Sequence, residues 1–152
     1  LPIYPFDYVL KYAAGIYDNA NNEFSDIDIT RGTVAHYVIE TIFKKAEYDT
    51  TKAREIIGVE YDELFDSAVH CKGIILLSKE NGLEYTFTKE KLEQSILSLL
   101  TIIEENKLTP YECEAEIECE LEDIGKFEAK IDMLLKNSDG DFVIFDFKCS
   151  VQ

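Results

Sequence analysis

Six glutamates alternate without a break along one short stretch of the chain, at Glu112, Glu114, Glu116, Glu118, Glu120 and Glu122. The positions between them hold Cys113, Ala115, Ile117, Cys119 and Leu121. Successive side chains of a β-strand point to opposite faces, so this period of two predicts a strand with one polar and one buried face. We expect the glutamates to form a solvated face that pairs across the sheet with Lys126, Lys130 and Lys136. The cysteines between them should point into the core.

Two further strands are predicted after this one. The alternating apolar residues from Phe127 to Leu135 indicate the second strand, and Asp139-Gly140 is a strong hairpin signal. The segment from Phe142 to Lys148 is apolar on both faces, so we expect the third strand to lie centrally in its sheet. The three strands form an antiparallel meander.

The first two thirds of the chain are predicted to be helical. Apolar residues at helical spacing indicate a helix over Pro5–Tyr17 and a second from the cap Thr30 to about Ala46. Shorter helices are expected at Thr51–Ile57, Tyr61–Val69 and Ile74–Lys79, the last ending at Asn81-Gly82, and a long helix capped by Thr88 at Lys89–Asn106. The fold class is therefore α+β, with a mixed sheet opened by the meander and flanked by helices, in a single domain over residues 1–152.

Charge counts against a simple nucleic-acid-binding protein. The chain has 31 acidic residues against 15 Lys and Arg, a formal net charge of −16, whereas proteins that neutralise phosphates are usually basic. A nucleic-acid role remains open if the acids gather around a metal. No apolar run approaches the roughly 20 residues of a membrane helix. Without a secretion signal or a Cys-x-x-Cys pair, we expect reduced cysteines, no zinc site and a cytoplasmic protein.

Two carboxylates interrupt the apolar strands. Asp132 follows Ile131 on the second strand, and Asp146 lies inside the third, on the same face as Lys148. The hairpin can bring the two acids together, where they repel unless a proton or cation lies between them. Hard divalent cations prefer such oxygen ligands. The alternative is a structural network of ion pairs with Lys130 and Lys148.

These residues also resemble a known family. Asp132, followed 14 residues later by Asp146-x-Lys148 at the end of a β-hairpin, is similar to the core of the PD-(D/E)XK nucleases. The segment Gly32-Thr33-Val34-Ala35-His36 resembles the Gly-Thr-x-x-His helix of the RecB/AddB-type branch, which includes CRISPR-associated exonucleases. The stretch from Tyr4 to Tyr12 resembles the Cys-Pro-Phe-x-Tyr-Phe-Leu-Lys-Tyr segment that precedes this helix in AddB-like proteins.

The resemblance implies a set of site residues. His36, Asp132 and Asp146 match the family's metal ligands, with the backbone carbonyl of Phe147 as a further ligand. Lys148 matches the lysine that orients the attacking water. Glu116 matches an acidic position on the preceding strand, with Glu114 as the alternative registration. The implied cofactor is Mg²⁺ or Mn²⁺. His36 is also compatible with an ordinary packing role at the border of its helix's apolar stripe.

The resemblance also implies a function, with three departures. We expect a metal-dependent DNA nuclease of exonuclease type in recombinational repair, working on single-stranded DNA beside a helicase. Tyr4 stands where the family has a cluster cysteine, so we expect no iron–sulfur cluster, and Ala129 replaces a glycine. A fourth strand and a helix with Gln-x-x-x-Tyr should follow Lys148, so we interpret the chain as a fragment. The alternative is an inactive nuclease fold that serves as a scaffold or holds DNA ends.

Overall fold

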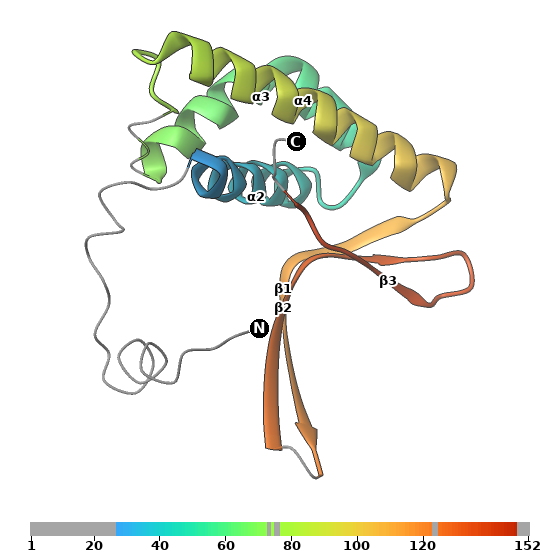
Figure 1. Cartoon of the computed structure of the whole chain (residues 1–152). Coiled ribbons are helices and arrows are strands. Elements are labelled where there is room, and N and C mark those ends of the chain that lie inside the picture. The colour runs from blue at the N-terminus through green and yellow to red at the C-terminus, as the bar shows by residue number, and fades with distance from the viewer. Residues whose placement is uncertain (1–26, 73, 75–76, 123–124, 149–152) are drawn as a thin grey trace, which may run out of the picture.

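The computed structural model describes residues 27–72, 74, 77–122 and 125–148, which form three helices followed by three strands (Figure 1). The predicted helix at 5–17 and the segment around residue 4 lie outside the described residues. The helices stack against one another on one side of the sheet, and the β1–β2 hairpin projects away from them (Figure 1). The predicted α+β class and its antiparallel meander are confirmed, and this arrangement is consistent with a restriction-endonuclease-like fold.

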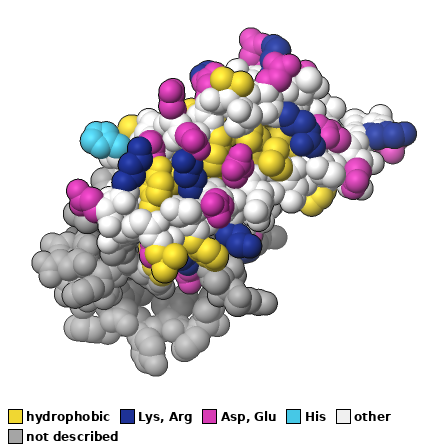
Figure 2. Space-filling view, turned by 90° about the horizontal axis from the view of Figure 1, so that it is seen from above, with side chains coloured by type: hydrophobic (Ala, Val, Ile, Leu, Met, Phe, Trp, Pro, Cys, Tyr) yellow, Lys and Arg dark blue, Asp and Glu magenta, His cyan; other side chains and the backbone are white. Residues whose placement is uncertain are grey.

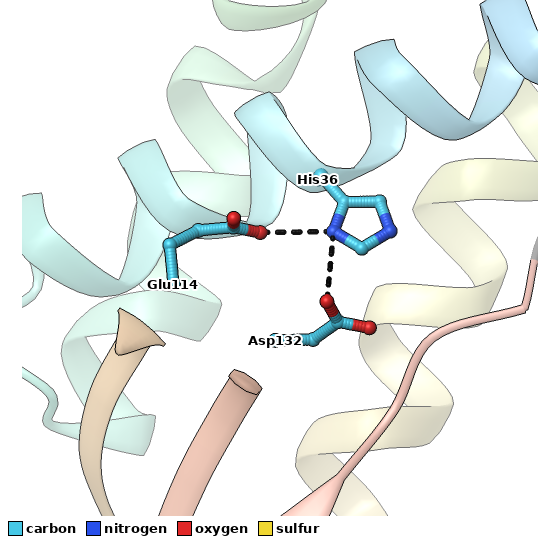
Figure 3. Close-up of side chains that lie close together, drawn as sticks. All are labelled: His36, Glu114 and Asp132. Atoms are coloured by element: carbon cyan, nitrogen blue, oxygen red, sulfur yellow. Dashed lines mark hydrogen bonds and ion pairs between the residues drawn. The ribbon is translucent and has the colours of Figure 1, made fainter. Parts of the chain in front are cut away.

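Helix α2 runs over Ile27–Lys45 and turns one apolar face into the core. Its stripe of Val34, Val38, Ile42 and Phe43 is completely buried, as the helical spacing predicts. The helix begins three residues before Thr30, so Thr30 is a buried interior residue and not the expected cap. The border of the same stripe carries His36, which points toward the sheet (Figure 3).

Helix α3 is one continuous helix over Thr50–Cys71, whereas we predicted two short ones. Its N-cap is Asp49, whose side chain accepts a hydrogen bond of 2.9 Å from the backbone N–H of Lys52. Gly58 does not break the helix, although a glycine inside a helix costs about 1 kcal/mol. Burial of Ile57 and Phe65 on either side of that glycine outweighs this cost.

Helix α4 runs over Gly82–Glu105 and begins earlier than predicted. Asn81 is its N-cap residue, so interpreting Asn81-Gly82 as the end of a preceding helix is wrong. Thr88 lies buried inside α4 instead of capping it, and its hydroxyl accepts a hydrogen bond of 3.2 Å from Arg31. Residue 74 and residues 77–80 do not form the α-helix predicted there, although Leu77 is fully buried.

The sheet has the order β1–β2–β3, with β1 over Thr109–Leu121, β2 over Gly125–Lys136 and β3 over Phe142–Phe145. Both neighbouring pairs are antiparallel. Gly140 adopts a φ of +87° in the hairpin between β2 and β3, as its sequence signal predicts. β3 is shorter than predicted and lies at an edge of the sheet that the described residues form, whereas we expected a central strand.

The outer half of the β1–β2 hairpin does not pack against the core. Cys113 and Ala115 are buried as predicted, but Cys119 is exposed, and Ile117 and Phe127 are 40% and 54% exposed. The hairpin extends beyond the helices, so neither of its faces is covered there by the described chain (Figure 1). The prediction that the whole odd-numbered face of β1 is buried is therefore wrong for its outer half. Cys71 is also exposed, on α3.

Charges of both signs are mixed on the helical side of the molecule. Seen from above, acidic and basic side chains alternate around small apolar patches (Figure 2). No helix within the described residues is long and apolar enough to cross a membrane.

Candidate metal centre

Three side chains from three different elements converge where α2 crosses the sheet (Figure 3). His36 extends from α2, Glu114 from β1 and Asp132 from β2. The His36 Nδ1 lies 2.9 Å from Glu114 Oε1 and 3.5 Å from Asp132 Oδ1. One potential ligand atom from each residue lies within 4.8 Å of the other two, which is compatible with a single cation bound among them. We call these three residues the acidic cluster.

An irregular backbone conformation brings Glu114 into this cluster. Its neighbours Cys113 and Ala115 pair with Met133 and Ile131, so Glu114 lies opposite Asp132 in the register of β1 and β2. Glu114 has a φ of +55°, a region that residues other than glycine rarely adopt. Only 13% of its side chain is exposed. Such strained residues persist where the surrounding structure fixes them, and here buried neighbours hold the strand on both sides.

The carboxylate of Glu114 is held in its charged form. Burial opposes its ionisation, but hydrogen bonds from Lys130 and His36 outweigh that effect and lower the pKa of Glu114 below its ordinary value. Lys130 Nζ lies 2.5 Å from Glu114 Oε2, and this pairing raises the pKa of the lysine. Glu114 is therefore an ionised ligand candidate that has already given up part of its hydration.

Asp132 is oriented by the chain that follows β3. The backbone N–H of Phe147 donates a hydrogen bond of 2.6 Å to Asp132 Oδ2, which leaves Oδ1 directed toward His36. The Phe147 ring packs edge-on against the His36 ring, with 5.8 Å between the ring centroids. One residue thus restrains two members of the acidic cluster, and its backbone carbonyl, the predicted ligand, belongs to the same short segment.

Asp146 and Lys148 lie at the rim of the site. They form an ion pair of 2.6 Å, and both side chains are largely exposed. The pKa of Asp146 is lowered mainly by its hydrogen bond with Lys148 and, to a smaller extent, by a hydrogen bond with Asp132. Asp146 therefore adjoins Asp132 but is not a member of the acidic cluster. The predicted alternative of a structural ion-pair network is realised in part, since Lys148 pairs with Asp146 while Lys130 pairs with Glu114.

Glu116, which the family resemblance favoured as the acidic residue on β1, lies outside the acidic cluster. It is exposed and faces Lys130 in the strand register, while Glu114 occupies the position beside His36. Periodicity could not separate the two glutamates, because both belong to the same polar face. The local φ of Glu114 and the position of the strand under α2 make the difference, and neither has a signal in the sequence.

The donor set fits a hard divalent cation. One imidazole nitrogen and two carboxylates suit Mg²⁺ or Mn²⁺, with imidazole favouring the transition metal. The His36 Nδ1 lies within hydrogen-bond distance of a Glu114 carboxylate oxygen, and a ring nitrogen would have to be unprotonated to ligate a cation. The acidic cluster opens onto a cleft of about 580 Å³, which His36 and Glu114 line together with Phe147, Lys130 and Lys148.

Comparison with known proteins identifies a matching family. Residues 5–152 match the model of a protein family described as the PD-(D/E)XK nuclease superfamily. No curated protein and no solved structure gave a significant match to the chain.

Proposed function

Because the chain belongs to the PD-(D/E)XK nuclease superfamily, we propose that its acidic cluster binds a divalent cation and hydrolyses phosphodiester bonds of DNA. Members of this superfamily generally are metal-dependent nucleases, and the match covers residues 5–152. The observation that carries the proposal is the convergence of His36, Glu114 and Asp132 beside a cleft. Two carboxylates at this distance from an imidazole give a cation one nitrogen and two oxygen ligands.

The bound cation would polarise the scissile phosphate and lower the pKa of a water molecule. The protein's own groups have separate tasks. Phe147 holds Asp132 through its backbone N–H, and Asp146 and the Phe147 carbonyl would be further ligands from the rim. Lys148 has no lone pair when charged, so it hydrogen-bonds the attacking water or a phosphate oxygen and does not ligate the metal.

We further propose the narrower role that the RecB/AddB-type resemblance suggests. The substrate would be single-stranded DNA delivered by a helicase during recombinational repair in the cytoplasm, with Mg²⁺ or Mn²⁺ as the cofactor and no iron–sulfur cluster. Support comes from Gly32-Thr33 one helical turn before His36 and from the Asp146-x-Lys148 pair after the hairpin. The exonuclease mode belongs to this narrower proposal.

Cleavage of a labelled single strand tests the proposal. Wild-type protein should cut it with Mn²⁺ or Mg²⁺ and stop in EDTA. Asp132→Asn should lose activity by about 10² or more, since it removes a charged group that contacts the cation. Asp139→Asn is the matched control, because it makes the same change at an exposed turn residue outside the site. Equal activity of the two variants would contradict the proposed site.

A second candidate is an inactive nuclease fold that holds DNA ends. One observation favours it, namely that Asp146 and Lys148 are exposed and pair with each other outside the acidic cluster. This candidate predicts that wild-type protein binds single-stranded DNA but does not cut it with either cation. Metal-dependent cleavage that is lost in Asp132→Asn excludes it.

A further inference from the structure

The cleft beside the acidic cluster extends well beyond it along α2. Seven of its lining residues belong to this helix, from Asp28 to Glu40, and they recur at the spacing of one helical face. The twelve helical steps from residue 28 to residue 40 span about 18 Å. Even in a duplex each strand advances only about 3.4 Å per nucleotide, so the cleft is longer than one nucleotide step. At the middle of this wall, Gly32 contributes no side chain and Thr33 only a short one.

Three lysines line this cleft, in a chain that has about half as many basic as acidic residues. Lys72 lies just after α3, Lys130 lies on β2 and Lys148 follows β3, so three separate parts of the chain bring an ammonium group to the same cleft. The whole sequence has only 15 Lys and Arg against 31 acidic residues. In an acidic protein that binds a polyanion, the basic side chains must lie along the path of that ligand.

The ion pairs single out one of these lysines. Lys130 is paired with Glu114, and Lys148 is paired with Asp146. The acids of the α2 wall are occupied as well, since Asp28 pairs with Arg31 and Glu40 with Lys44. Within the described part of the chain, no carboxylate forms an ion pair with Lys72. Its Nζ lies instead over the ring of Tyr37, at 5.0 Å from the ring centroid.

We propose that Lys72 binds a backbone phosphate of the substrate strand next to the phosphodiester at the acidic cluster. Tyr37 directly follows His36 on α2 and both residues line the cleft, so the ring that holds the lysine and a cluster residue belong to the same cleft wall. The cation–π contact fixes the ammonium without neutralising its charge, which leaves it available to a phosphate oxygen. This inference rests on the proposed function for the identity of the ligand, a single strand of nucleic acid.

The test is the salt dependence of binding, measured in EDTA so that the strand is not cut. Each phosphate contact to a single strand contributes about 0.7 to the slope of log K against log salt. Lys72→Ala should reduce the magnitude of this slope by about 0.7 and weaken binding by roughly fivefold at 0.1 M salt. Lys72→Arg should retain the wild-type slope, because it keeps the charge.

Lys91→Ala is the matched control. Lys91 also lies over an aromatic ring, at 5.9 Å from the Phe87 centroid, and it is exposed on α4 and does not line the cleft. It should bind with the wild-type slope. Circular dichroism melts of each variant establish that the fold is intact, and Lys72→Gln replaces the alanine variant if that one unfolds.

The outcomes separate this inference from the proposed function. Wild-type slopes in Lys72→Ala, equal losses in Lys72→Ala and Lys91→Ala, or no binding of a labelled oligonucleotide by wild-type protein would overturn the inference even if the protein cuts DNA. A loss of slope confined to Lys72→Ala supports it, and does so even if no cleavage is found with Mn²⁺, which would count against the proposed nuclease alone.

Discussion

The two neighbouring glutamates of β1 give the sharpest prediction. Glu114 is 13% exposed and bonded to His36 and Lys130, whereas Glu116 is exposed and is not part of the acidic cluster. Glu114→Gln and Glu116→Gln remove the same charge from the same strand face, two residues apart. Only Glu114→Gln should remove most of the stabilisation of the fold by Mn²⁺.

The expected size follows from linkage. A cation that binds only the folded state at one hundred times its dissociation constant stabilises it by about 2.7 kcal/mol. For a chain of this length that corresponds to a rise in Tm of about 5 to 10 °C. Loss of a group supporting a metal typically weakens affinity 10- to 100-fold, and loss of a direct ligand should reach at least the upper value. At the same Mn²⁺ concentration, Glu114→Gln would then keep about 0.4 kcal/mol, or about 1 °C.

Thermal melts with and without Mn²⁺ measure both variants and the wild type. Without metal, Glu114→Gln should change stability by no more than about 1 kcal/mol, because its partner Lys130 is largely exposed and because Asp132 loses a repulsive neighbour. Equal Mn²⁺ shifts in Glu114→Gln and wild type would refute the assignment of Glu114. A shift lost only in Glu116→Gln would favour the register first expected from the sequence.

Three other variants extend the account. Lys148→Ala should retain the Mn²⁺ shift of Tm and cut single-stranded DNA about 10² more slowly in single-turnover assays, and loss of the shift would show that the lysine acts on metal binding. Burial opposes ionisation of Asp66, but hydrogen bonds from Lys79 and Tyr85 outweigh burial and lower the pKa of Asp66. The charged carboxylate therefore stabilises the fold above about pH 3.8, and this contribution is lost as the pH falls further. Urea unfolding across that range should show a shallower loss of stability in Asp66→Asn, and parallel curves would be inconsistent with this. Met133→Ala, at a fully buried position, should lower the free energy of unfolding by about 2 to 5 kcal/mol, whereas a change under 1 kcal/mol would contradict its place in the core.

Sequence periodicity predicted the elements better than their ends. The stripe from Val34 to Phe43 and the buried pair Cys113 and Ala115 follow directly from their spacing. Asn81-Gly82 was misinterpreted because the same residue types favour both ends of a helix. Two helices, Thr51–Ile57 and Tyr61–Val69, were predicted where the structure has one, because the burial that joins them across Gly58 depends on packing against α2 and α4.

The positions of the strands depend on long-range packing. An apolar strand can lie in the middle of a sheet or at an edge whose apolar residues stay exposed, and Phe142 and Ile144 on β3 are 56% and 60% exposed. Likewise, the alternation along β1 continues past the point where the helices end, so Ile117 follows the pattern of a buried residue without being covered. Sequence pattern gives the face of a strand but not what lies over it.

The candidate site was foreseen in kind but not in every member. Asp132 and His36 come together as expected, and Asp146 lies next to Asp132 through the hairpin. Glu114 was predicted only as the alternative to Glu116. Its place in the cluster depends on its positive φ and on the packing of β1 under α2, which the sequence does not indicate. Lys72 has no motif at all, and only the folding of α3 against α2 brings it to the cleft.

Crystals grown with Mn²⁺ would test the central claim most directly. Anomalous diffraction at the manganese edge should give one strong peak bounded by His36, Glu114 and Asp132, within about 2.0 to 2.3 Å of one atom from each, given ordinary metal–ligand distances. Soaking the same crystals with EDTA should remove the peak. A peak absent from this position, or one held by Glu116 without Glu114, would contradict the account.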